Sequence, residues 1–144
     1  MEQKVYFGSW DGEGYERMKS DFSDYSYSTH SHVEIPDFPP PEAILLASYG
    51  GASYEGDALV LFERDGKLYE VSGSHCSCNG LEDQWTPCEV TWPALKARVD
   101  TAAANKAAGR SWRGVLDDHE DEAFARFCEL VAEHTATNDY SEAR

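Results

Sequence analysis

The chain has 144 residues, enough for one domain with a single buried core. Its 27 carboxylates outnumber its 12 lysines and arginines, and the formal net charge is −15. That charge argues against direct binding to nucleic acid or to anionic membranes, because both would repel the chain. The first residues lack a basic stretch followed by an apolar run, and no run approaches roughly 18 apolar residues. We therefore expect a cytoplasmic protein without a signal peptide or a membrane span.

The N-terminal part of the chain predicts little regular structure. Residues 4–10 are rich in β-forming side chains and indicate a short opening strand. Residues 15–22 could form one or two helical turns. From 23 to 41, four prolines and alternating Ser, Tyr and Asp predict an irregular segment packed by its own aromatic side chains. Residues 11–42 are thus expected to be an irregular, acidic and aromatic region.

Residues 43–90 are expected to form the sheet core of the single domain over 1–144. Segments 43–49 and 58–64 are apolar on both faces, which is typical of central strands. Asp65-Gly66 then predicts a two-residue turn with positive φ angles, followed by a strand over 67–72.

The resulting 58–72 hairpin has a self-consistent register, in which an aromatic pair and a β-branched pair share one face. The expected pairs are Arg64 with Lys67, Phe62 with Tyr69, and Val60 with Val71. This register places the end of the returning strand beside Asp57. If strands 43–49 and 58–64 pair antiparallel, the loop between them lies at the same edge of the sheet.

Two helices follow, at about 92–108 and 118–135. Thr91 suits the N-cap of the first, and the second begins with carboxylates that suit the positive end of the helix dipole. The apolar faces at helical spacing are Trp92, Leu95, Val99 and Ala102 or Ala103 in the first helix and Phe124, Phe127, Cys128 and Val131 in the second. We predict an α+β fold in which a small antiparallel sheet of three or four strands packs against two C-terminal helices.

Charge is distributed unevenly along the chain. No Lys or Arg occurs between Lys19 and Arg64, whereas the helix region 91–115 carries five basic residues and one Asp. In one interpretation this helix neutralises an acidic neighbour and the other carboxylates form a solvated surface. In the other, the acidic surface imitates a phosphate backbone and binds the basic surface of a partner protein. The candidate contacts are Asp21, Asp24, Glu34, Asp37, Glu55, Asp57, Glu82, Asp83, Asp117, Asp118, Glu120 and Asp121.

Three interpretations apply to the cluster of His75, Cys76, Cys78 and Cys88. Three thiols and an imidazole could supply four zinc ligands, with His30, His32 or His119 as a substitute, although the spacing is not one of the established zinc patterns. Cys76 or Cys78 could be a nucleophile, but no Lys or Arg lies from 68 to 95 to lower a thiol pKa. The thiols could also simply pack at the sheet edge. Trp85 and Trp92, which flank Cys88, are expected to be packing residues.

Part of the sequence resembles a block in small uncharacterised bacteriophage and prophage proteins. The matching elements are Ile44-Leu45-Leu46-Ala47-Ser48-Tyr49, Asp65-Gly66-Lys67-Leu68-Tyr69-Glu70-Val71, His75-Cys76-Ser77-Cys78, Gly80-Leu81-Glu82 and Gln84-Trp85, within residues 43–92. The resemblance implies a phage context and carries over no catalytic residue. It leads us to expect a non-enzymatic acidic protein that inhibits a host protein, such as a CRISPR effector or another nucleic-acid-binding complex. A zinc-stabilised binding module is the alternative, and a cysteine-dependent hydrolase is the third hypothesis.

Overall fold

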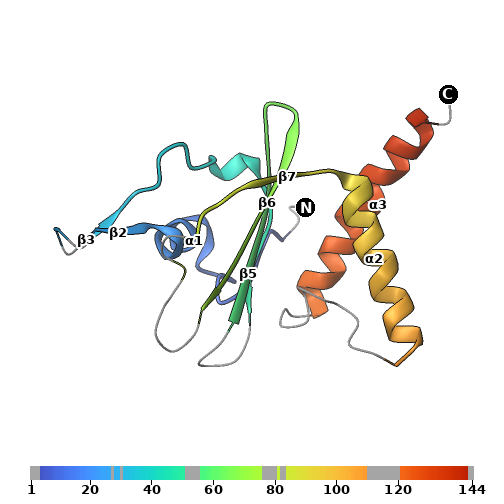
Figure 1. Ribbon diagram of the computed structural model, residues 1–144, viewed down its shortest axis with the longest axis horizontal. Helices are drawn as coiled ribbons and strands as arrows, with labels where there is room; N and C mark the ends of the chain where they lie inside the picture. Colours follow the sequence, from blue (N-terminus) through green and yellow to red (C-terminus); the bar gives the residue numbers. More distant parts are fainter. Residues whose placement is uncertain are drawn as a thin grey trace.

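The computed structural model describes residues 4–26, 28–29, 31–50, 56–75, 81, 84–109 and 121–142. A five-stranded sheet of order β1-β4-β5-β6-β7 separates two layers, with α1 on one face and α2 and α3 on the other (Figure 1). The strands of this sheet are β1 (Tyr6–Gly8), β4 (Ile44–Gly50), β5 (Gly56–Arg64), β6 (Lys67–His75) and β7 (Cys88–Val90). The helices are α1 (Gly14–Phe22), α2 (Trp92–Ala107) and α3 (Asp121–Glu142), and Pro41–Ala43 forms a 3₁₀ turn, η1. Within the described ranges, no helix is both long enough and apolar enough to cross a membrane.

The predicted α+β class is confirmed, but the prediction of an antiparallel sheet with three or four strands is wrong. The sheet is mixed, because β1 lies parallel to β4 with Gly8 opposite Tyr49. Backbone hydrogen bonds from Ala47 N to Val5 O (2.9 Å) and from Ser9 N to Tyr49 O (2.8 Å) fix this pairing. The fifth strand, β7, pairs antiparallel with β6.

The register of the β5–β6 hairpin is confirmed. Arg64 lies opposite Lys67, Phe62 opposite Tyr69 and Val60 opposite Val71. Asp65 and Gly66 occupy the turn with φ angles of 55° and 78°, as a two-residue turn of this type requires. The pairing of β4 with β5 is also antiparallel, so the ends of β4, β5 and β6 meet as expected.

The strands β4 and β5 are buried on both faces, as their continuous apolar sequences predict. On β5, Leu59 and Leu61 face α2 and α3, whereas Val60 and Phe62 face α1. Strand β4 also contributes to both cores, with Leu46 on the side of α2 and α3 and Ala47 on the side of α1. The register shift between Ile44 and Leu46 explains why these two residues, two positions apart, lie in different cores.

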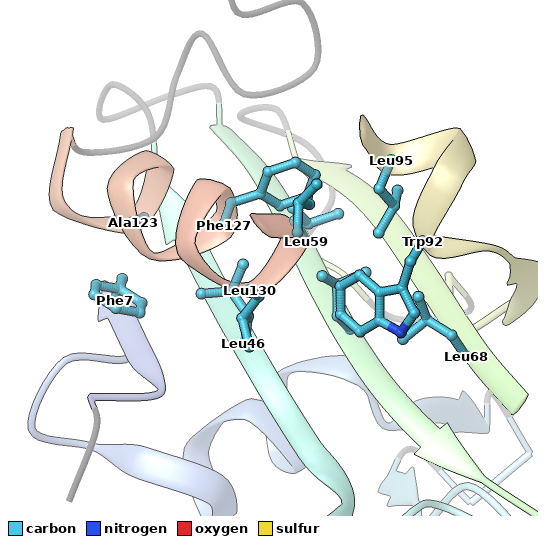
Figure 2. Packing of buried hydrophobic residues seen from close by; sticks show 11 residues of the cluster. Phe7, Leu46, Leu59, Leu68, Trp92, Leu95, Ala123, Phe127 and Leu130 are labelled. Carbon is cyan, nitrogen blue, oxygen red and sulfur yellow. The ribbon is translucent and has the colours of Figure 1, made fainter. Parts of the chain in front are cut away.

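The two C-terminal helices cover one face of the sheet, as predicted. The Thr91 hydroxyl caps α2 by accepting a hydrogen bond from Ala94 N at 3.2 Å. Figure 2 shows Trp92 and Leu95 of α2 and Phe127 and Leu130 of α3 directed onto the strands. Each such buried side chain contributes about 1.5–3 kcal/mol to stability. The helix α3 runs to Glu142, beyond the predicted end near 135, and its predicted start at 118 lies outside the described residues.

The opposite face carries an aromatic core. Met18 and Phe22, one turn apart on α1, are fully buried with Trp10. Trp85 packs there as expected, with its ring centroid 5.0 Å from that of Phe22 and 4.3 Å from that of Phe38.

The region 11–42 is more regular than predicted. Besides α1, it contains a two-stranded antiparallel hairpin of β2 (Asp24–Ser26) and β3 (Ser31–Val33). These strands pair only with each other, and the hairpin projects away from the main sheet beyond α1 (Figure 1). The sequences of β2 and β3 do not place apolar residues at every second position. The period of two that indicates a half-buried strand is therefore absent, and the sequence did not predict this hairpin.

Candidate functional site

The ends of β5 and β6 lie where the sequence placed them. Gly56 is opposite His75, and Asp57 is opposite Ser74. The chain therefore leaves the sheet beside Asp57 at the point where the predicted cluster begins. Cys76 and Cys78 follow directly, outside the described residues.

Cys88 does not share this end of the sheet. It is exposed and lies on β7 opposite Glu70, whereas His75 closes β6. The separation from Glu70 to His75 along an extended strand is about 16 Å at ~3.3 Å per residue. Since zinc ligands lie within about 2.3 Å of the metal, the register does not bring Cys88 and His75 to a common ion. Among the side chains that the structure describes, no group of three His, Cys, Asp or Glu residues is arranged to hold a metal.

Gln84 completes the edge of the sheet near the predicted cluster. The pairing of β6 with β7, continued at the same register, places Gln84 opposite Ser74. The side-chain amide of Gln84 makes the two hydrogen bonds that a neighbouring strand would make, because it donates to Ser74 O (2.7 Å) and accepts from Ser74 N (2.8 Å). Gly73 allows this approach, since a Cβ there would lie 3.2 Å from Gln84 Oε1. A hollow of about 260 Å³ lies alongside, lined by Asp57, Ser72, Ser74 and Gln84 among others.

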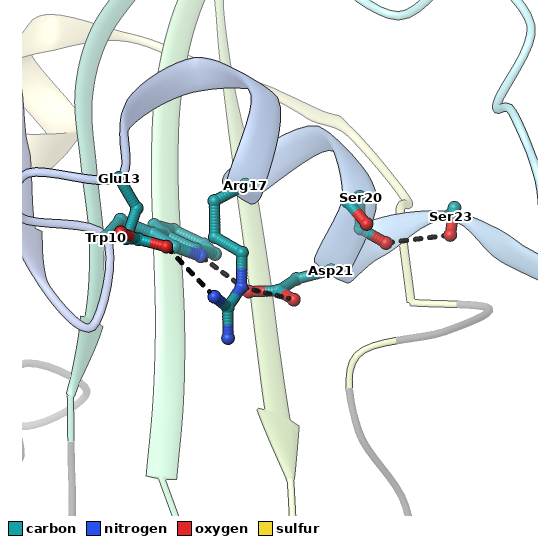
Figure 3. Close-up of polar contacts among 6 residues, drawn as sticks. All are labelled: Trp10, Glu13, Arg17, Ser20, Asp21 and Ser23. Carbon is teal, nitrogen blue, oxygen red and sulfur yellow. Dashed lines mark hydrogen bonds and ion pairs between the residues drawn. The ribbon is translucent and has the colours of Figure 1, made fainter.

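The structure describes the side chains of four of the predicted partner-contact carboxylates, Asp21, Glu34, Asp37 and Asp57. Asp21 has a role inside the fold, because it accepts a hydrogen bond from the Nε1 of fully buried Trp10 at 2.8 Å and pairs with Arg17 (Figure 3). Glu34 is exposed and pairs with Lys19 at 2.9 Å. Asp37 is exposed with a φ angle of 58°, and its carbonyl accepts a hydrogen bond from Arg64. Asp57 lies at the start of β5, half-buried.

The remaining predicted carboxylates cannot be placed by their side chains. Asp24 lies on β2 and Asp121 at the first described residue of α3, and only their backbone positions are described. Outside the described residues lie Glu55, Glu82, Asp83, Asp117, Asp118 and Glu120.

The positive charges of the described residues are largely neutralised within the fold. Seven lysines and arginines form ion pairs with carboxylates: Lys4, Arg17, Lys19, Lys67, Lys96, Arg98 and Arg126. The strongest of these joins α2 to β6, where the Arg98 guanidinium donates two hydrogen bonds, at 2.5 and 2.8 Å, to the nearly buried carboxylate of Glu70. Hydrogen bonding to Glu70 raises the pKa of Arg98 above its usual value. The expectation that the basic helix neutralises an acidic neighbour is therefore confirmed at Arg98.

A second hollow lies between α1 and the segment after β3. It has a volume of about 210 Å³ and is lined by Glu16, Lys19, Ser20, Ser23 and Glu34. The four residues from α1 and its end recur at helical spacing, so they share one face of the helix. Figure 3 shows the hydroxyl of Ser23 donating to the carbonyl of Ser20 at this end of α1.

The electrostatic influence of this group reaches Tyr15. Burial raises the pKa of the Tyr15 hydroxyl, Lys19 acts in the opposite direction, and Glu16, Glu42 and Glu34 add to the rise. Sequence reasoning identified only Glu34 of this group. The polar stripe of Glu16, Lys19, Ser20 and Ser23 was the signal that could have found the others.

In comparisons with known proteins, no family model, no curated protein and no solved structure matches this chain.

Proposed function

We propose that this protein acts by binding rather than by catalysis, and that its acidic surface docks on a basic surface of another protein. The resemblance of residues 43–92 to bacteriophage proteins favours a host protein as the partner. A nucleic-acid-binding complex of the host, such as a CRISPR effector, presents the kind of basic surface that the charge requires. Occupation of that surface would inhibit the complex.

The observation that carries this proposal is that most of the described lysines and arginines form ion pairs within the chain. Seven of the lysines and arginines in the described part of the chain are already paired with carboxylates of the same chain. These seven cations are therefore engaged within the chain, and the net charge of the whole sequence is still −15. Such a surface attracts basic proteins over a Debye length and speeds their association.

The carboxylates that support binding differ from those that support folding. Asp21 holds Trp10 and Arg17, and Glu70 holds Arg98, so neither is part of the proposed contact surface. Among the predicted contacts, Glu34 has a side chain that is 81% exposed. It marks the region in which the proposal is best supported by geometry.

The test is capture from a nuclease-treated bacterial extract on the immobilised full chain, followed by elution with salt. We expect one or more basic proteins to be retained at low salt, to elute between about 0.1 and 1 M salt, and to be displaced by duplex DNA. Over that range the Debye length falls from about 10 to about 3 Å. Retained proteins that neither salt nor DNA releases would contradict the proposal.

A further inference from the structure

The β2–β3 hairpin stands apart from the main sheet. Its strands, Asp24–Ser26 and Ser31–Val33, pair with each other, and the hairpin projects beyond α1 (Figure 1). Among the strands that the structure describes, none pairs with the outer edge of either one. A two-stranded hairpin is only marginally stable in water, because the outer backbone N–H and C=O groups of both strands have no partner strand. A third strand on either edge would therefore stabilise this hairpin.

The outer edge of β3 lacks the features that block edge strands in other proteins. Lysine, proline and bulges on an edge strand prevent the addition of another chain. The sequence of β3, Ser31-His32-Val33, has none of them, and its register with β2 is continuous. The edge of the main sheet at β7 differs, because Pro87 precedes it and Glu89 within it pairs with Lys67. Of these two edges, β3 is the one that is open to a further strand.

The side chains of β3 suit a neighbouring strand of mixed character. Val33 is the one exposed large hydrophobic residue in the described part of the chain, at 47% exposure. Ser31 is also exposed, and its hydroxyl lies 2.8 Å from that of Thr29. Because Ser31 and Val33 are two positions apart, they lie on the same face of the strand. This face can therefore contact an apolar side chain at Val33 and a long polar one above the small serine.

The charge of the chain determines which strand is attracted to this edge. The stretch without Lys or Arg between Lys19 and Arg64 includes the whole hairpin, and the net charge of the chain is −15. A second copy of this chain carries the same charge and is repelled, whereas a basic segment is attracted. When a strand adds to a sheet edge, backbone hydrogen bonds supply affinity and alternate side chains supply selectivity. A basic extended segment meets both requirements.

We propose that the outer edge of β3 receives an extended segment of the basic protein partner, containing lysine or arginine, as a third strand of the hairpin. Backbone hydrogen bonds hold the segment, and Val33 contacts one of its apolar side chains. This inference rests on the proposed function and specifies how the partner is held.

The test measures hydrogen exchange by NMR on the ¹⁵N-labelled full chain with a peptide of four Lys-Val repeats at low salt. A peptide of four Lys-Gly repeats is the control, because it has the same charge and a low strand propensity. We expect the Lys-Val peptide to bind more tightly. It should slow exchange roughly five- to ten-fold at the β3 amides that point outward, which is the size of one hydrogen bond, and leave the β7 amides unchanged.

Two lysine substitutions on exposed strand positions supply a second, matched comparison. Ser31 lies on β3 and Cys88 on β7, both side chains are exposed, and either substitution adds one positive charge. Ser31→Lys should lower the affinity for the Lys-Val peptide roughly two- to five-fold, which is the size of one unfavourable cross-strand pair. Cys88→Lys should lower it by clearly less.

The outcomes separate this inference from the proposed function. Equal binding of the two peptides without slower exchange at β3, or equal effects of the two substitutions, would overturn the third strand while the proposed function stands. Slower exchange at β3 that grows with protein concentration in the absence of peptide would assign the edge to a second copy of the chain and would also overturn it. Absence of binding by either peptide at low salt would instead contradict the electrostatic basis of the proposed function itself.

Discussion

The parallel pairing of β1 with β4 makes a sharp prediction at Gly8. This residue has a φ angle of 68°, and a Cβ built on it would lie 2.2 Å from the carbonyl oxygen of Tyr49 on the neighbouring strand. The clash is with backbone, which cannot rotate away. Gly8→Ala therefore combines left-handed strain of about 1–2 kcal/mol with an overpacking cost of about 1–3 kcal/mol. We expect a loss of roughly 2–5 kcal/mol in the free energy of unfolding.

Gly12 provides the matched control for this change. Its φ angle is 83°, but a Cβ there would meet nothing within 4 Å. Gly12→Ala should thus show the strain alone, about 1–2 kcal/mol. Urea denaturation of both variants, followed by tryptophan fluorescence, measures the difference. Equal losses for the two variants would show that β1 does not approach Tyr49 as closely as the structure has it.

Three further predictions follow from other contacts. Arg98→Ala leaves the carboxylate of Glu70, whose side chain is 9% exposed, without its partner and should cost about 1–3 kcal/mol, less than for a wholly buried pair because Arg98 is 41% exposed. Urea titration measures this loss, and replacement of both residues by Met should recover part of it. Gln84→Ala removes two hydrogen bonds from the edge of β6 and should accelerate hydrogen exchange at the amide of Ser74, with little change at Val71, and an unchanged rate at Ser74 would contradict the role of Gln84. Burial raises the pKa of Tyr6 from 10.0 to about 12, so the folded state keeps this proton longer than the unfolded state and stability should fall as pH rises from 10 to 12. Tyr6→Phe should lose less stability over that interval than the wild type, and parallel pH profiles would refute the assignment.

The parts of the fold that the sequence predicted correctly are those with local signals. The turn residues Asp65 and Gly66 determine the register of the β5–β6 hairpin, because a two-residue turn admits only one pairing. The N-cap at Thr91 and the apolar spacing after it predict the start of α2 within one residue of its observed position. Burial of β5 on both faces follows from its uninterrupted apolar sequence.

The parts that the sequence did not predict depend on contacts between distant segments. The parallel pairing of β1 with β4 has no turn to announce it, and the only trace in the sequence is a glycine at the point of close approach. The hairpin of β2 and β3 lacks apolar alternation, so its pairing could not be recognised by period. Cys88 was grouped with His75 because the two are near in sequence, whereas β7 carries Cys88 back along β6 to a position opposite Glu70.

The sequence alone predicted only part of the acidic region around Glu34. Glu34 was identified from the absence of Lys and Arg between Lys19 and Arg64. The hollow beside it required the packing of α1 beside the segment after β3, which no local pattern specifies. Asp21, from the same acidic stretch, instead accepts a hydrogen bond from Trp10 and stabilises the fold.

The central claim is that this chain binds a basic protein through its negative surface. The most direct measurement is the affinity of the full chain for a purified basic protein retained from the extract, determined by calorimetry at several salt concentrations. We expect the affinity to fall steeply and linearly on a logarithmic scale as salt rises, and Glu34→Gln to weaken binding at every concentration. An affinity that is indifferent to salt would contradict the claim.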